Sequence, residues 1–152
     1  MQTQLKNEIG ECEIFAEISA VDLDPARFLA RARSPRCGGL VLFSGDVREL
    51  NLGQSVSHLE YEAHENLAVQ TMQEILGAAA ERWQLGAAGC VHRVGVLQPG
   101  ESAVLVVAAA AHRAAAYQAN EYIIHRVKHE APIWKKEVYV DGSHRWGHNC
   151  DH

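Results

Sequence analysis

Lysines gather around a single proline in the stretch 127–137. Pro132 has no backbone N–H and disfavours the helical conformation at the residue before it, so a helix that carries Lys128 must end there. Lys135 and Lys136 then begin an extended run, in which neighbouring side chains point to opposite faces, and Lys136 is therefore left out of the candidate site. Lys128 at the helix end and Lys135 at the strand start can converge on one small volume. Two close ammonium groups repel each other, which lowers the pKa of at least one and suits it to acid–base or nucleophilic chemistry. The alternative is a solvated basic edge.

Two other places in the chain have residues that suit an anion. His112 and Arg113 follow an apolar strand and begin the next helix, whose free N–H groups and partial positive charge favour anions. The guanidinium group of Arg113 adds paired N–H donors that can bind a phosphate or a carboxylate. Arg48 begins a polar loop at the end of another strand, where functional side chains are common. An ordinary strand-to-helix corner and a solvated loop arginine are the alternatives.

The segment 143–152 carries histidines and a cysteine, which are residue types that bind Zn²⁺. The candidate ligands are His144, His148, Cys150 and His152. Their spacing, H-x3-H-x-C-x-H, matches no common zinc framework, so a disordered polar tail is the favoured interpretation. The four cysteines of the chain are widely spaced without a C-x-x-C pair, which predicts reduced thiols, and none has a local histidine partner for Cys–His catalysis.

Length and composition limit the class of protein. The chain has 152 residues, of which 47% are hydrophobic and 22% charged, values typical of one soluble globular domain. A net charge of −5 argues against general nucleic-acid binding. The longest apolar stretch, 103–111, is too short to cross a membrane, and the N-terminus lacks the pattern of a signal peptide. We therefore expect a cytoplasmic protein that binds neither nucleic acid nor membrane.

The hydrophobic pattern predicts the element order β-α-β-β-α-β-β-α-β and an α+β fold with a mixed, mainly antiparallel sheet and three main helices. Residues 1–10 are expected to form a flexible N-terminus, 11–146 a single domain, and 147–152 a polar tail. Strand 55–63 is expected to pair with strand 39–47, and strand 102–111 to lie centrally. The expected helices span 25–33, 65–83 and 113–129, and the other expected strands 11–19, 88–96 and 134–140.

Several motifs, taken in order, resemble the large, catalytic subunit of molybdopterin synthase. The matching stretches are GGLVLFSGDVR at 38–48, NLGQSV at 51–56, LEYEA at 59–63, HRVG at 92–95, PGE at 99–101, AHR at 111–113, and Lys128 followed by APIWKKE at 131–137. Arg145 and Trp146 are similar to the family's closing motif. The resemblance covers about residues 11–146.

The resemblance implies an α/β-hammerhead fold and a homodimer. A small ubiquitin-like sulfur-carrier subunit binds each large subunit, which gives a heterotetramer. The C-terminal Gly-Gly thiocarboxylate of that carrier enters a pocket, and two sulfurs pass to cyclic pyranopterin monophosphate to form the dithiolene of molybdopterin. The resemblance implies no metal and no organic cofactor. A non-enzymatic anion- or nucleotide-binding module and a metal-binding protein are the rival hypotheses.

Carried over position by position, the resemblance places seven residues in the pocket. They are Phe43, Arg48, His112, Arg113, Lys128, Lys135 and Arg145. Lys128 is the first candidate for the catalytic lysine and Lys135 the second, and Arg145 is a candidate for a contribution from the partner subunit. The resemblance does not decide which lysine is the acid or base, and it leaves the role of His64 open.

Overall fold

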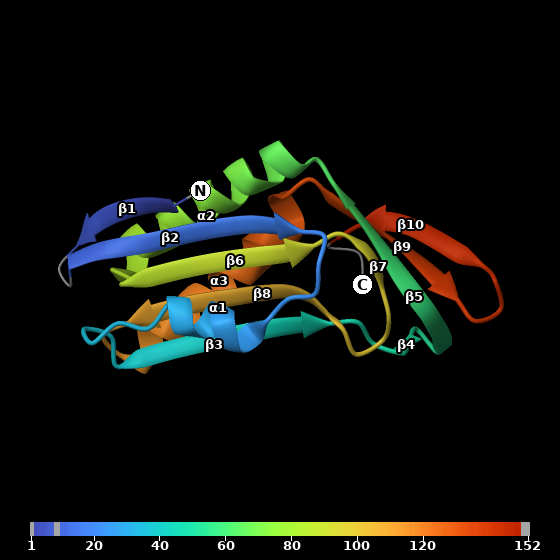
Figure 1. Cartoon of the computed structure of the whole chain (residues 1–152), viewed down its shortest axis with the longest axis horizontal. Coiled ribbons are helices and arrows are strands. Elements are labelled where there is room, and N and C mark those ends of the chain that lie inside the picture. Colours follow the sequence, from blue (N-terminus) through green and yellow to red (C-terminus); the bar gives the residue numbers. More distant parts are fainter. Residues whose placement is uncertain (1, 8–9, 150–152) are drawn as a thin grey trace.

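Three helices and two sheets make up the part of the chain that the computed structural model describes, residues 2–7 and 10–149 (Figure 1). The helices are α1 (Pro25–Arg31), α2 (Glu65–Trp83) and α3 (Arg113–Glu130). The strands are β1 (Gln2–Asn7), β2 (Gly10–Ser19), β3 (Gly39–Asp46), β4 (Leu50–Asn51), β5 (Gln54–Ala63), β6 (Ala87–Arg93), β7 (Gly95–Leu97), β8 (Ser102–Ala110), β9 (Ile133–Tyr139) and β10 (His144–His148). The predicted α+β hammerhead class is confirmed.

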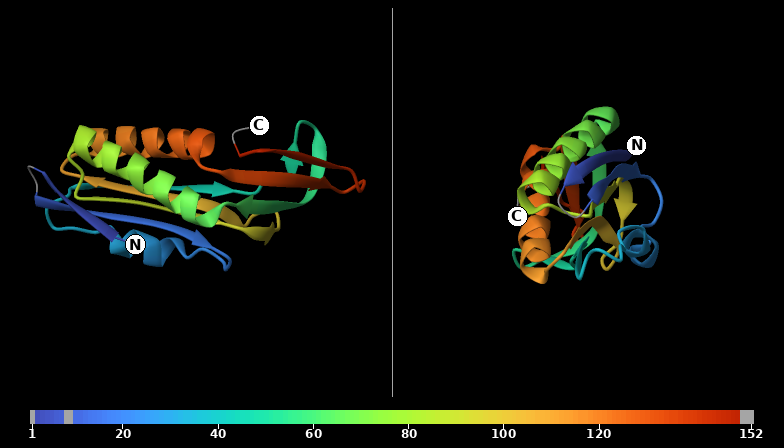
Figure 2. Two further views of the ribbon diagram at one scale, coloured as in Figure 1. Left: turned by 90° about the horizontal axis from the view of Figure 1, so that it is seen from above. Right: turned by 90° about the vertical axis from the view of Figure 1, so that its left-hand side faces the viewer.

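The first sheet has the strand order β1-β2-β6-β8-β3, with β2 parallel to β6 and the other pairs antiparallel. Helices α2 and α3 cover one face and α1 the other (Figure 2). Strand β8 lies inside the sheet and is buried on both faces, which explains its unbroken apolar sequence. Val104 and Val106 belong to the core beneath α2 and α3, whereas Leu105 and Val107 pack with Phe28 of α1.

The second sheet has the order β10-β9-β5-β4, and β7 pairs with β5 beside it. The expected pairing of strand 55–63 with strand 39–47 is wrong, because β3 pairs with β8 while β5 pairs with β9. An alternating pattern shows which face of a strand is buried but does not identify its neighbour. The chain therefore forms two sheets that meet at an angle, rather than one (Figure 1).

The helix signals in the sequence are confirmed. The Asp24 carboxylate caps α1 by accepting hydrogen bonds from the backbone N–H groups of Ala26 and Arg27, and Pro25 is the first helical residue. The predicted apolar stripe of α2 is fully buried, and it consists of Ala68, Met72, Ile75, Leu76 and Ala79. No helix within residues 2–7 and 10–149 has both the length and the apolar character needed to cross a bilayer.

Both ends of the chain contain strands where the sequence predicted loose segments. Residues 2–7 form β1, which pairs antiparallel with β2. Residues 144–148 form β10, which pairs antiparallel with β9, and Asn149 beyond it is 1% exposed. Backbone hydrogen bonds to a neighbouring strand order these polar segments. The pattern of their side chains does not predict this pairing. Cys150 and His152 lie outside the described residues.

A strained turn joins β4 to β5. Leu52 and Gly53 form a two-residue hairpin loop with φ values of 51° and 79°. Positive φ at both positions is typical of type I′ turns, in which the first position usually holds asparagine, aspartate or glycine. A leucine there costs about 1 kcal/mol because its Cβ crowds the backbone.

Candidate active site

The helix break at Pro132 places Lys128 and Lys135 on two adjoining elements. Helix α3 ends at Glu130, and Ala131 leaves the helical conformation with φ −70° and ψ 137°. Its N–H still donates to the Val127 carbonyl at 3.1 Å, so the last turn stays closed. Lys128 lies in that last turn, whereas Lys135 lies in β9 after the break. This part of the sequence analysis is confirmed.

Lys135 is buried beside a carboxylate that the sequence analysis did not assign to the site. Its Nζ lies 3.4 Å from Oε1 of Glu137, and the other oxygen, Oε2, accepts hydrogen bonds from the Tyr139 hydroxyl and, at 2.7 Å, from the Asn51 amide. Burial alone would raise the pKa of Glu137. The hydrogen bonds from Tyr139 and Asn51, with the nearby Lys135 ammonium, outweigh burial and hold that pKa below its usual value. The carboxylate is therefore charged at neutral pH.

Two arginines join the same cluster. Arg145 lies directly opposite Glu137 in the β9–β10 register, and the two residues line a small cavity with Lys135 and Gly147. Arg48 donates from Nη2 to Oδ1 of Asn51 at 3.4 Å, which connects it to Glu137 through one amide. Three predicted cations, Arg48, Lys135 and Arg145, therefore share one carboxylate centre within a single chain.

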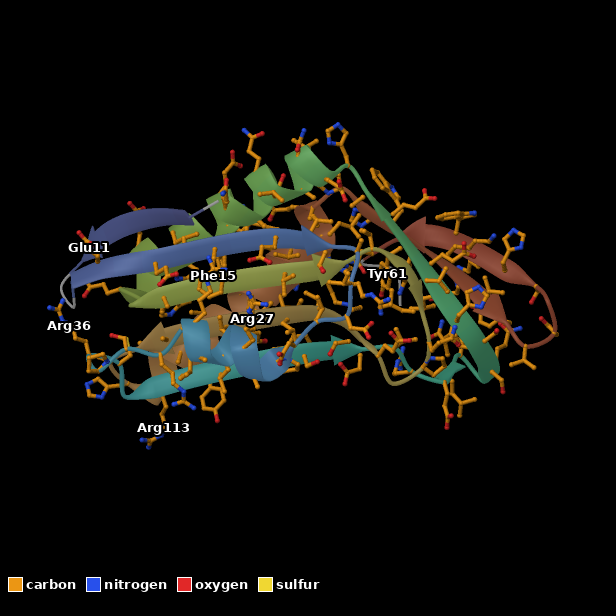
Figure 3. The ribbon with its side chains drawn as sticks, in the orientation of Figure 1. Glu11, Phe15, Arg27, Arg36, Tyr61 and Arg113 are labelled. Atoms are coloured by element: carbon orange, nitrogen blue, oxygen red, sulfur yellow. The ribbon has the colours of Figure 1, made fainter. Side chains whose placement is uncertain are left out.

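His92 and Tyr61 connect this cluster to Lys128. Tyr61 is the register partner of Lys135 in β5–β9, and its ring packs edge-on against the His92 ring with centroids 4.9 Å apart. Burial lowers the pKa of His92 to about 4, a hydrogen bond to the Arg93 carbonyl opposes this, and the charge of Lys128 lowers it further. Lys128 is thus close enough to act on His92 electrostatically. The site lies where the two sheets meet, near Tyr61 in Figure 3.

The imidazole of His92 is fixed in one neutral form. Its Nδ1 lies 2.8 Å from the Arg93 carbonyl oxygen, which can only accept, so Nδ1 carries the proton. Its Nε2 is then free to accept from the Asn149 amide at 3.1 Å. Burial also raises the pKa of Tyr61 to about 12, with the Glu137 charge as a smaller cause. Both rings are therefore neutral walls of the site at physiological pH.

His112 and Arg113 do not reach this cluster within one chain. They lie at the N-terminal end of α3, whose other end carries Lys128. Fifteen residues of α-helix separate Arg113 from Lys128 by about 22 Å. Figure 3 shows Arg113 and Tyr61 at opposite ends of the first sheet. Phe43 lies in β3 between these ends and is 37% exposed. Within a single chain, His112 and Arg113 therefore lie apart from the cluster of Arg48, Lys135 and Arg145.

The histidines outside the cluster have other surroundings. His64 precedes α2 and caps it, because its Nδ1 accepts from the Leu67 N–H at 3.3 Å. His144 and His148 lie at the two ends of β10, about 13 Å apart at the usual strand rise, which is too far to share one ion. In the portion of the chain that the structure describes, no three histidine, cysteine, aspartate or glutamate side chains are arranged to hold a metal.

Glu137 and Asn51 are the principal residues that sequence reasoning missed. A signal for Glu137 was present, because it lies two residues after Lys135 in a strand and must therefore share its face. Asn51 carries no comparable signal, since it belongs to the two-residue strand β4, whose position depends on the β4–β5 turn. His92 lies in an apolar strand, and only the packing of one sheet on the other brings it beside Tyr61.

A buried carboxylate surrounded by lysine and arginine side chains can bind an anionic group and move protons beside it. The chain is thus an α+β protein whose described part carries a cluster of cations around a buried carboxylate. A sequence model of the MoaE protein family matches residues 18–130. The chain belongs to this family, whose curated relatives are named molybdopterin synthase catalytic subunits. The enzyme prediction is therefore confirmed over a non-enzymatic binding module.

Three relatives illustrate the similarity. The molybdopterin synthase catalytic subunit of Bacillus subtilis (strain 168) is 40% identical over 126 residues, which are 83% of this chain and 80% of that protein. The crystal structure of molybdopterin synthase from Staphylococcus aureus matches with a TM-score of 0.82 and 36% identity, over 86% of this chain and 95% of that chain. A complex of subunits 1 and 2 of molybdopterin-converting factor from Helicobacter pylori shares the fold, with a TM-score of 0.72 and 23% identity over 87% and 89% of the two chains.

Proposed function

We propose that this subunit transfers two sulfurs, one after the other, from the thiocarboxylated C-terminus of a small ubiquitin-like carrier to cyclic pyranopterin monophosphate, forming the molybdopterin dithiolene in the cytoplasm. The observation that carries this proposal is the cluster of Arg48, Lys135 and Arg145 around Glu137. The substrate phosphate and the carrier's terminal group are both anions, and this cluster offers cations to both. The Helicobacter pylori relative, a complex of two different subunits, supports a separate carrier.

The residues have three roles in the proposed reaction. Arg48 and Arg145 bind the phosphate, and Phe43 borders the substrate. Lys128 and Lys135 move the protons that sulfur attack, opening of the cyclic phosphate and loss of water require. Lys128 keeps its place as the first candidate, because it lies in the last turn of α3 and its charge acts on the neutral His92 ring of the site. The sulfur arrives on the carrier, so the subunit needs no nucleophilic cysteine, and both Cys12 and Cys90 are buried free thiols.

A second copy of the chain completes the site in this proposal. His112 and Arg113 lie about 22 Å of helix away from Lys128, so they serve the neighbouring copy's cluster rather than their own. Arg145, by contrast, lines the cavity of its own chain and needs no partner to reach Lys135. A homodimer with one carrier on each subunit gives the heterotetramer expected from the resemblance.

Incubation with thiocarboxylated carrier and cyclic pyranopterin monophosphate tests the proposed function. We expect dithiolene to form with the wild-type subunit and to fall by at least tenfold with Lys128→Ala. A folded subunit that binds the carrier but forms no dithiolene contradicts the proposal. An unchanged rate in Lys128→Ala contradicts the role of Lys128 alone.

A further inference from the structure

The β4–β5 hairpin presents two leucines to solvent in an unfavourable conformation. Leu50 is 56% exposed and Leu52 is 76% exposed. Leu52 also has a positive φ of 51°, which a residue such as asparagine adopts at lower cost. A leucine at this position gains nothing from burial within its own chain and strains the turn. Strain at an exposed apolar residue points to contact with another molecule.

The hairpin is rigidly joined to the reaction site. Asn51, between the two leucines, is 9% exposed and donates to Glu137 at 2.7 Å. The Glu49 carbonyl accepts from the Val56 N–H at 2.8 Å and closes the base of the hairpin. A molecule that docks on Leu50 and Leu52 therefore lies beside Arg48 and the Glu137 cluster, which makes this surface a rim of the site.

The N-terminal end of α3 has the complementary surface. Tyr117 is 63% exposed and lies one helical turn beyond Arg113. This inference rests on the proposed function, in which His112 and Arg113 of a second copy come to the cluster. Any approach that brings them there also brings Tyr117. The charges agree as well, because exposed Glu49 on the hairpin is complementary to Arg113 and the positive end of the helix.

We propose that Leu50 and Leu52 of one copy pack against Tyr117 of the second copy, with Glu49 beside the second copy's Arg113. In a two-fold dimer the same contact occurs twice, once at each site. The hairpin thereby aligns Arg113 of one chain with Arg48, Lys135 and Arg145 of the other. Leu52 is a docking residue in this arrangement and does not touch the substrate.

Sedimentation equilibrium of Leu52→Asn tests the contact without carrier or substrate. Asparagine tolerates positive φ, so the folded chain should be at least as heat-stable as wild type. The dimer dissociation constant should nevertheless rise at least tenfold. Tyr117→Ser should weaken the dimer to a similar extent. The two changes together should weaken it by much less than the product of the single effects, because both remove the same contact.

Val21→Asn is the matched control, because Val21 is 70% exposed in the loop before α1, outside the hairpin and α3. Its dimer constant should equal that of wild type. An unchanged dimer constant in Leu52→Asn overturns the contact, as does a double variant whose effects multiply. A wild-type chain that stays monomeric while dithiolene forms also overturns it, together with the shared site, and leaves the sulfur-transfer activity standing. A dimer sensitive to Leu52 but without sulfur transfer supports the contact and contradicts the function.

Discussion

The Lys135 ammonium lies 3.4 Å from the Glu137 carboxylate, and the two side chains are only 10% and 8% exposed. Both charges are removed from water, and each is stabilised by the other. Removal of either one would leave the other buried without an opposite charge. The structure therefore pairs Lys135 with a carboxylate, while the charge of Lys128 acts on His92.

Replacement of Glu137 by glutamine should reduce both stability and activity. The amide keeps an oxygen for Tyr139 and Asn51 but loses the charge that pairs with Lys135. We expect unfolding free energy to fall by about 2 kcal/mol and sulfur transfer by at least tenfold. Denaturant unfolding and dithiolene formation measure the two effects. Glu60→Gln is the control, since Glu60 pairs with Lys136 on the exposed face and should change stability by less than about 1 kcal/mol.

The two adjacent lysines of β9 should differ in their effect on catalysis. Lys135 faces the cluster, whereas Lys136 lies on the opposite face, 3.6 Å from Glu60 and over the Trp146 ring. Lys135→Ala should lower the turnover number at least tenfold, and Lys136→Ala should leave it within about twofold of wild type. Equal losses in the two variants would contradict this prediction. They would show that turnover depends on the total positive charge of β9 and not on the face where each lysine lies.

Mixing two inactive variants should restore activity if a second copy completes the site. Arg113→Ala and Lys135→Ala each remove one half of the proposed shared site. Random exchange of subunits makes half of the dimers mixed, each with one intact site, so about a quarter of wild-type activity should return. A mixture that stays inactive after exchange, with mixed dimers confirmed by mass spectrometry, would show that Arg113 serves another purpose.

Stability should decline on acidification through the protonation of His92. Its folded pKa is about 4 against an ordinary value of 6.5, so between these values the unfolded chain binds a proton that the folded chain does not. The stabilisation is present above pH 6.5 and is lost as the pH falls toward 4, by about 3 kcal/mol in total. Guanidinium unfolding at pH 7, 5.5 and 4.5 should show this loss in wild type, and His92→Gln should lack that component. Parallel pH profiles for the two proteins would contradict the assignment.

The local features of the site could be predicted from the sequence because they depend on neighbouring residues. Pro132 ends α3 by its own covalent structure, and alternation in β9 separates the faces of Lys135 and Lys136. The Asp24 cap and the stripe of α2 follow in the same way from short-range spacing. The same alternation, applied two residues further, would have placed Glu137 in the site.

The partners of the strands could not be predicted in this way. Strand β5 has the alternating pattern of a half-buried strand, yet nothing in that pattern selects β9 over β3 as its neighbour. The strands at the two ends of the chain were missed for the same reason, since β1 and β10 depend on backbone bonds to β2 and β9.

The sequence by itself determined the chemical content of this protein: the helix break, the lysines on each side of it, the arginines at strand ends and the motifs of the family. Tertiary structure alone decided which of these residues meet. The pairing of β5 with β9 brings Tyr61 to Lys135 and, through Asn51, Arg48 to Glu137, whereas the rigid length of α3 holds Arg113 away from Lys128. Short-range spacing encodes conformation, but contacts between distant segments depend on the whole packed core. Only that core shows that Arg113 lies far from the cluster of Lys135 and Glu137.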